Sequence, residues 1–195
     1  MDKEKIVEKI AEKYEEIIKI LELEKRGISK EHIKETPYRI AKMLVYELFD
    51  GVYSDPPKIT TFPYEDDAII PVTLSKIRIK STCSHHFVPF SGYAAIQYLP
   101  DKEIIGISKL ARIANYFSRR PQVQEELTSQ IGNYIFEKIK PKYVAVVISA
   151  KHLCISHRGA NEPDTTMTTT FFKSKNEIYL DKRHDIINQL INLIQ

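Results

Sequence analysis

Two short stretches, far apart in the chain, each place a histidine close to a cysteine. They are Cys83-Ser84-His85-His86 and His152-Leu153-Cys154, and their cysteines are the only two among the 195 residues. Thiolate and imidazole are ligands that zinc prefers, and a site with three protein ligands keeps its fourth position for a water that ionises near pH 7. We therefore predict a hydrolytic Zn²⁺ site formed by Cys83, His86 and Cys154.

Two further histidines, His85 and His152, flank the predicted ligands. Residues 151–154 continue an apolar run and are expected to be extended, so that His152 and Cys154 point to the same side of a strand. His152 and His85 would then stand beside the ion as proton donors or acceptors. Two explanations without a metal stay open, because a C-x-x-H motif arises by chance and the two thiols could form a disulfide or a buried apolar pair.

Basic residues border both stretches. Ser108 is expected to be the N-cap of a helix, and Lys109 and Arg112 follow it on one helical face, beside free backbone amides that favour phosphate. Arg158 follows the second stretch, and Arg39 lies in the first turn of another expected helix. We expect these cations to converge on phosphates near the metal, although each residue alone is consistent with an ordinary solvated charge.

A carboxylate, Glu125, lies near the expected start of a further helix. The simple explanation is that the helix dipole favours negative charge there. The functional alternative is a guanine site, since a carboxylate can accept two parallel hydrogen bonds from the ring N–H and the amino group of guanine.

Composition excludes several classes of protein. With 43% apolar residues the chain can bury one core, and its net charge of +3 is too weak to argue for binding to nucleic acid. The longest apolar run is far shorter than the ~20 residues of a membrane helix. Because of the weak charge and the short apolar run, we expect binding to neither nucleic acid nor a membrane. Two distant cysteines and no apolar leader after Met1 favour a reducing cytoplasm, in which the thiolates stay free for a metal.

Apolar periodicity predicts the elements that position these residues. Helices are expected at 3–24, 36–50, 108–117, 123–139 and 186–194, and strands at 69–74, 77–81, 93–99, 104–107, 142–152 and 165–172. Proline-rich residues 52–66 are expected to be an extended connector. An N-terminal helical region with its connector, 1–60, would thus precede a catalytic domain, 61–195.

The order of these elements favours an α+β fold, an antiparallel sheet with two consecutive helices on one face. Such a sheet leaves exposed edges, which a chain of this size can cover by meeting other copies of itself. We therefore expect a ring-like homo-oligomer. Edges protected by charge alone are the alternative.

Several motifs of the chain, taken in order, closely resemble the GTP cyclohydrolase I family. They are Cys83-x-His85-His86-x-x-Pro89-Phe90-x-Gly92, Gly106-Ile107-Ser108-Lys109-Leu110-Ala111-Arg112, Arg120-Pro121-Gln122-Val123-Gln124-Glu125-x-Leu127-Thr128, and His152-x-Cys154 followed by Arg158-Gly159. Thr36-Pro37-x-Arg39 fits the family's N-terminal region. The resemblance covers nearly the whole chain and implies a tunnelling fold, a toroidal homodecamer and active sites at subunit interfaces.

The resemblance also implies a reaction, in which GTP and water give 7,8-dihydroneopterin triphosphate and formate, in the first step of tetrahydrofolate and pterin biosynthesis. It implies that Cys83, His86 and Cys154 bind zinc and that His85 and His152 transfer protons. By the same resemblance, Glu125 with Gln124 matches the guanine anchor. The positions that hold the ribose triphosphate are matched by Ser108, Lys109, Arg112, Arg158 and Arg39.

Two rival functions differ in their metal chemistry. A related tunnelling-fold enzyme, the nitrile reductase of deazapurine biosynthesis, would need a free reactive thiol and no zinc, and the pair His152-x-Cys154 argues against it. A structural zinc module would close the site with a fourth side chain. Binding of single-stranded nucleic acid is disfavoured because no basic stripe with interleaved aromatic residues is present.

Overall fold

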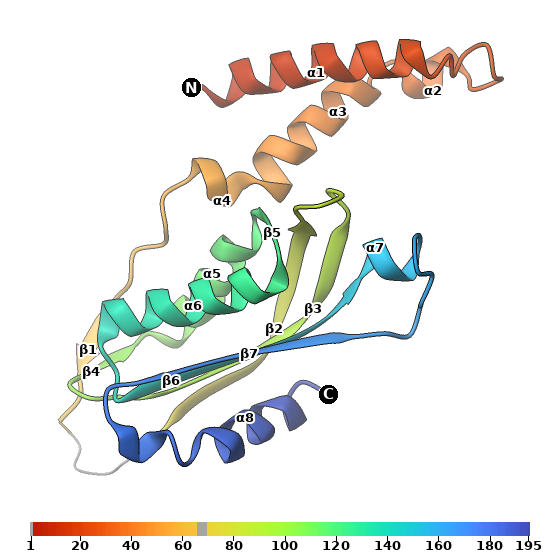
Figure 1. Cartoon of the computed structure of the whole chain (residues 1–195). Helices are drawn as coiled ribbons and strands as arrows, with labels where there is room; N and C mark the ends of the chain where they lie inside the picture. The colour runs from red at the N-terminus through yellow and green to blue at the C-terminus, as the bar shows by residue number, and fades with distance from the viewer. Residues whose placement is uncertain (1, 66–69) are drawn as a thin grey trace. The chain divides into compact units, whose positions relative to one another are not determined.

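A five-stranded sheet, in the order β5-β2-β3-β6-β7, forms the centre of the unit Pro56–Gln195 (Figure 1). The computed structural model describes residues 2–65 and 70–195. The strands are β2 (Val72–Cys83), β3 (Pro89–Leu99), β5 (Pro121–Gln122), β6 (Tyr143–His152) and β7 (Met167–Ser174). All neighbours are antiparallel except β5, which pairs in parallel with the end of β2.

Helices cover both faces of this sheet. The helices α5 (Ile107–Ser118) and α6 (Gln124–Ile139) pack on one face, and α8 (Arg183–Asn192) packs on the other (Figure 1). Side chains of a strand alternate between the faces, so Ala94 belongs to the core under α5 and α6 whereas Ala95 contacts the cluster under α8. The predicted α+β fold, with two consecutive helices on one face of a mainly antiparallel sheet, is confirmed.

The apolar spacing of α5 explains how it packs. Leu110, Ile113, Ala114 and Phe117 recur every three or four residues and are all buried. The helix begins at Ile107 with Gly106 as its N-cap, so the prediction that Ser108 is the cap is wrong by two residues. The side chain of Ser108 is instead exposed in the first turn.

The predicted connector contains a short strand. Within residues 52–66, β1 (Thr61–Pro63) pairs with β4 (Glu103–Ile105), which leads directly into α5. The two strands predicted at 69–74 and 77–81 form one strand, β2, since an irregularity between Leu74 and Ile77 only shifts its register with β3. The predicted start at Ile69 lies outside the described residues.

The unit Met1–Asp55 is helical. Its α1 (Lys3–Ile20) is shorter than the predicted helix 3–24, and it is followed by α2 (Lys30–Ile33) and α3 (Thr36–Lys42). The predicted helix 36–50 is broken, because α3 continues as the π-helix η1 (Met43–Leu48) before α4 (Asp50–Tyr53). A small core of Ile6, Val7, Ala41 and Val45 holds the unit together.

Two minor elements complete the chain, α7 (Leu153–Ser156) after β6 and the 3₁₀ turn η2 (Glu177–Tyr179) before α8. No helix among residues 2–65 and 70–195 combines the length and hydropathy that crossing a membrane requires. The functional division predicted at residue 60 stays a prediction.

Candidate metal and substrate site

The two cysteine stretches meet at one end of the sheet. The ligand atoms of Cys83, His86 and Cys154 all lie within 4.8 Å of one another. Ligand atoms around a tetrahedral zinc are about 3.5 to 3.8 Å apart, so the group is close to a ligating arrangement. Both cysteines are free thiols, which rules out the disulfide alternative. The residues present thus fit a metal ion, and among the described residues the group has three members.

A tight turn between β2 and β3 brings His86 to this place. The N–H of Cys83 donates to the carbonyl of Val88 at 2.9 Å, and the N–H of Phe87 donates to the carbonyl of Cys83 at 2.9 Å. Phe87 has a positive φ of 52°, which reverses the chain within a few residues. Cys83 is buried at the end of β2, whereas His86 in the turn is exposed.

The route of the chain to Cys154 differs from the prediction. Residues 152 and 154 do not alternate on one strand, because β6 ends at His152 and Cys154 lies in the helical turn α7. At the end of β6, His152 lies opposite Phe90 of β3. The turn is closed by the N–H of His157, which donates to the carbonyl of Leu153 at 3.1 Å. A helical turn, and not the strand pleat, therefore directs Cys154 toward Cys83.

His152 is held from two directions. Its ring stacks on Phe90, with centroids 4.5 Å apart and planes 2° from parallel, and its Nε2 lies 2.9 Å from Oε1 of Gln124. Burial lowers the pKa of His152, and the nearby carboxylate of Glu125 offsets part of this effect. Burial therefore favours the neutral form of His152, which can accept a proton.

His85 has a more open environment. Its Nδ1 lies 3.8 Å from the sulfur of Cys83, and its side chain is exposed. The structure thus brings both predicted proton-transfer histidines to the Cys-His-Cys group, one fixed by packing and one near the surface.

The two residues of the predicted guanine anchor face in different directions. Glu125 is exposed in the first turn of α6, close enough to His152 to influence its pKa. Gln124 is fully buried, and its amide is bonded within the protein. Only Glu125 therefore presents its side chain outward.

The predicted phosphate-binding cations are placed unequally. Burial raises the pKa of the Cys154 thiol, and the Cys83 thiol raises it further. The guanidinium of Arg158 lowers the same pKa in part, which places Arg158 near the metal group. Lys109 and Arg112 lie on α5 with Arg112 exposed, and their contact with phosphate stays a prediction, as does that of Ser108. Arg39 lies on α3 in the other unit, and its part in the site also stays a prediction.

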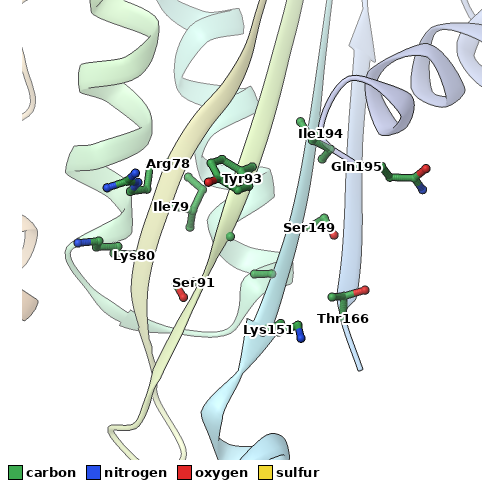
Figure 2. Close-up of a pocket in the computed structure, with 12 residues that line it drawn as sticks. Arg78, Ile79, Lys80, Ser91, Tyr93, Ser149, Lys151, Thr166, Ile194 and Gln195 are labelled. Carbon is green, nitrogen blue, oxygen red and sulfur yellow. The ribbon is translucent and has the colours of Figure 1, made fainter. Parts of the chain in front are cut away.

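A cavity of about 570 Å³ lies on the face of the sheet opposite to α5 and α6 (Figure 2). Its lining includes Arg78, Lys80, Tyr93 and Lys151, and none of the predicted site residues. Tyr93 lies two residues from Ala95 on β3, so both side chains point to the face that α8 covers. Phe90 and its partner His152 on β6 point to the other face, which α5 and α6 cover. The cavity is therefore separate from the Cys-His-Cys group.

Comparison with known proteins gives consistent matches along the chain. The family model described as GTP cyclohydrolase I matches residues 10–191. The protein named GTP cyclohydrolase 1 of Wigglesworthia glossinidia brevipalpis is 42% identical over 167 residues, which cover 83% of this chain and 77% of that protein. The protein of the same name from Serratia proteamaculans is 41% identical over 171 residues, covering 87% of this chain and 76% of that protein.

A solved structure is also similar, at a lower level. The crystal structure of the archaeosine synthase QueF-Like in the apo form has a TM-score of 0.44 and 14% identity, covering 56% of this chain and 96% of that chain. A likeness at this level carries no functional inference. The family match over residues 10–191, together with relatives above 40% identity, shows that the chain belongs to the GTP cyclohydrolase I family.

Proposed function

We propose that this chain is a GTP cyclohydrolase I, which converts GTP and water into 7,8-dihydroneopterin triphosphate and formate. The product would enter tetrahydrofolate or pterin biosynthesis. The observation that carries the proposal is the convergence of Cys83, His86 and Cys154 beside His152 in a chain of this family. Two thiolates and an imidazole favour Zn²⁺ over harder metals. When bound, the ion would supply a Lewis acid and an activated water next to the purine.

The proposed roles of the two histidines follow from their surroundings. Opening the imidazole ring of the purine and releasing formate both require proton transfers to nitrogen and oxygen atoms. Burial lowers the pKa of His152 and so favours its neutral form, and the stacking on Phe90 fixes its ring plane. It is therefore suited to take up and return a proton at one place. His85, which is exposed and near Cys83, is the second proposed proton-transfer group.

Substrate recognition is assigned to the residues around this centre. The exposed carboxylate of Glu125 is proposed to accept hydrogen bonds from the ring N–H and amino group of guanine. The triphosphate is assigned to Ser108, Lys109, Arg112, Arg158 and Arg39. Arginine offers bidentate contacts to phosphate and lysine a point charge, so the set matches a ligand with several negative charges.

We also propose that the chain assembles into a toroidal homodecamer with sites at subunit interfaces. The sheet supports this proposal, because β7 pairs only with β6 and β2 pairs with β5 only at Thr82 and Cys83 within the described residues. Long unpaired strand edges favour pairing with another chain.

A direct assay tests the proposed reaction. The purified chain, loaded with Zn²⁺, is incubated with GTP, and formate is quantified together with the fluorescence of the pterin after oxidation. We expect stoichiometric formate and pterin, and the loss of both after a chelator has removed the metal. Formate without pterin, or neither product from metal-loaded protein, would contradict the proposal.

A further inference from the structure

The side-chain amide of Gln124 lies in a hydrogen-bond network, and two backbone carbonyls fix which end of the amide is nitrogen and which is oxygen. Its Nε2 lies 3.1 Å from the carbonyl oxygen of Ile148 and 3.0 Å from that of Met167. Carbonyl oxygens only accept hydrogen bonds, so the amide nitrogen must face them. Turning the amide over would place its oxygen against two carbonyl oxygens, one of them buried, which is unfavourable.

Two threonine hydroxyls confirm this direction. Oγ1 of Thr128 lies 2.7 Å from the backbone carbonyl of Gln124, to which it donates its single hydrogen. Oγ1 of Thr169 lies 2.6 Å from Oγ1 of Thr128 and must therefore be the donor in that pair. The hydrogen of Thr169 is thus engaged, and its oxygen is left to accept from Nε2 of Gln124 at 3.0 Å. The two hydrogens of Gln124 Nε2 are thus shared among three acceptors, the carbonyl oxygens of Ile148 and Met167 and Oγ1 of Thr169.

The orientation of the amide determines the protonation of the neighbouring ring. Oε1 of Gln124 is an acceptor and lies 2.9 Å from Nε2 of His152, so this ring nitrogen must carry a hydrogen. In a neutral imidazole the other nitrogen, Nδ1, then carries the lone pair. The parallel stack on Phe90 holds the ring plane, and so the ring cannot rotate freely away from the amide.

We propose that Gln124 is a positioning residue: its buried amide accepts from Nε2 of His152 and, with the stack on Phe90, fixes the tautomer and the orientation of that ring, an inference that rests on the proposed function. Gln124 then acts through His152 and makes no side-chain contact with guanine. The hydroxyl of Thr169 accepts from the same amide and donates to the hydroxyl of Thr128, which in turn donates to the backbone carbonyl of Gln124, so β7 helps to hold the amide in place.

Neutron diffraction of the unmutated, metal-loaded protein tests the tautomer without any variant. Crystals are exchanged into D₂O at about pH 8, roughly 1.5 units above the ordinary histidine pKa of ~6.5. We expect a deuteron on Nε2 of His152, directed at Oε1 of Gln124, and none on Nδ1. A deuteron on Nδ1 would overturn the proposal.

Kinetics of Gln124→Met test the consequence for catalysis. Methionine has a similar length, but its thioether sulfur is only a weak acceptor and it has no amide N–H to bind the carbonyl oxygens. We expect kcat to fall by about 10²- to 10³-fold, as for other losses of an oriented general base, with KM for GTP and the preference for GTP over inosine triphosphate unchanged. A raised KM or a lost preference with unchanged kcat would show instead that Gln124 binds guanine, and would overturn the proposal. An unchanged kcat would do the same.

Gln97→Met is the matched control. Gln97 is also a buried glutamine, and it bonds to Thr73 and Tyr143 on the opposite face of the sheet from the α5 and α6 core. Loss of its amide should reduce stability without a specific loss of kcat. If Gln124→Met does not fold, the neutron result still decides the tautomer. If the unmutated protein does not turn over GTP, the proposed function fails separately, and the position of the deuteron still tests the network.

Discussion

The two histidines beside the thiols differ in how firmly their atoms are held. His152 has a stacked ring and a hydrogen-bonded Nε2, whereas His85 is exposed and 3.8 Å from a sulfur. A general base contributes most when its geometry is fixed before substrate binds. His152 is therefore the residue whose loss should affect chemistry without affecting the ligands of the metal.

His152→Ala should reduce formate release by about 10²- to 10⁴-fold while leaving bound metal and chain association intact. The change removes a proton-transfer group, which is worth about 10²- to 10⁴-fold in rate, and removes none of the three proposed ligands. Formate assays and metal analysis of the same preparation measure the two effects. His184→Ala, on α8, is the control and should retain full turnover. Normal turnover by the His152 variant would refute its assigned role.

Glu125→Ala should weaken the discrimination of guanine. If the carboxylate accepts two hydrogen bonds from the base, its loss removes roughly 1.5 to 3 kcal/mol, or about 10- to 100-fold in kcat/KM for GTP relative to inosine triphosphate. Glu126→Ala is the matched control, since Glu126 is the next residue and is also exposed in the first turn of α6. Equal effects of the two substitutions would indicate that Glu125 contributes only to the helix dipole.

At the scale of elements, the close approach of β3 and β6 positions His152. Gly92 of β3 lies opposite Ala150 of β6, two residues before His152, and a Cβ at Gly92 would lie 1.9 Å from the backbone oxygen of Ser149. Backbone atoms cannot move aside as a flexible side chain does. Glycine is therefore required here for the spacing of the strands that carry Phe90 and His152.

Gly92→Ala should destabilise the fold by about 2 kcal/mol or more, because the two strands must separate to admit the methyl group. Gly106→Ala is the matched control, since its Cβ would meet nothing closer than 3.8 Å. At Gly106, alanine makes the unfolded chain less flexible, which stabilises the fold by ~0.4 to 1 kcal/mol, but it is a poorer N-cap than glycine. We therefore expect the free energy of unfolding to change by no more than about 1 kcal/mol. Urea unfolding of both variants measures the difference. A stable Gly92→Ala protein would show that the strands can separate at little cost.

The elements also show what a sequence can and cannot predict. The long elements α5, α6 and β6 follow from local apolar periodicity, and their predicted positions are confirmed to within a few residues. The short strands β1 and β5 were missed because each is defined by pairing with a distant strand. The turn α7 was also missed, since an apolar segment next to a strand gives no sign of where the strand ends.

The site was predictable to a similar extent. The residue types and spacing around Cys83 and Cys154 predicted the metal group that the structure brings together. The amide network was not predictable, because Gln124, Thr128 and Thr169 are ordinary buried polar residues until the contact of α6 with β7 is known. Phe90 is part of a recognisable motif, yet its stacking depends on the register between β3 and β6.

At the scale of the whole molecule, the chain has the tunnelling fold of its family, and its sheet ends in two open edges. The outer edge of β7 and most of the outer edge of β2 have no strand neighbour among residues 2–65 and 70–195. Each edge presents unpaired N–H and C=O groups, which favour joining the edge of another copy. A closed ring would pair every such edge, whereas a single chain would leave them in water.

Light scattering should therefore give a mass many times the 22.6 kDa of one chain, and a decamer would give ten times that value. Hydrogen exchange of the backbone amides tests whether the strand edges carry the association. In the assembly the outward amides of β7 should exchange slowly, because a neighbouring strand accepts their hydrogen bonds, and they should exchange much faster after dilution to a single chain. A mass of one chain at micromolar concentration, or fast exchange along β7 in a large assembly, would contradict pairing through these edges.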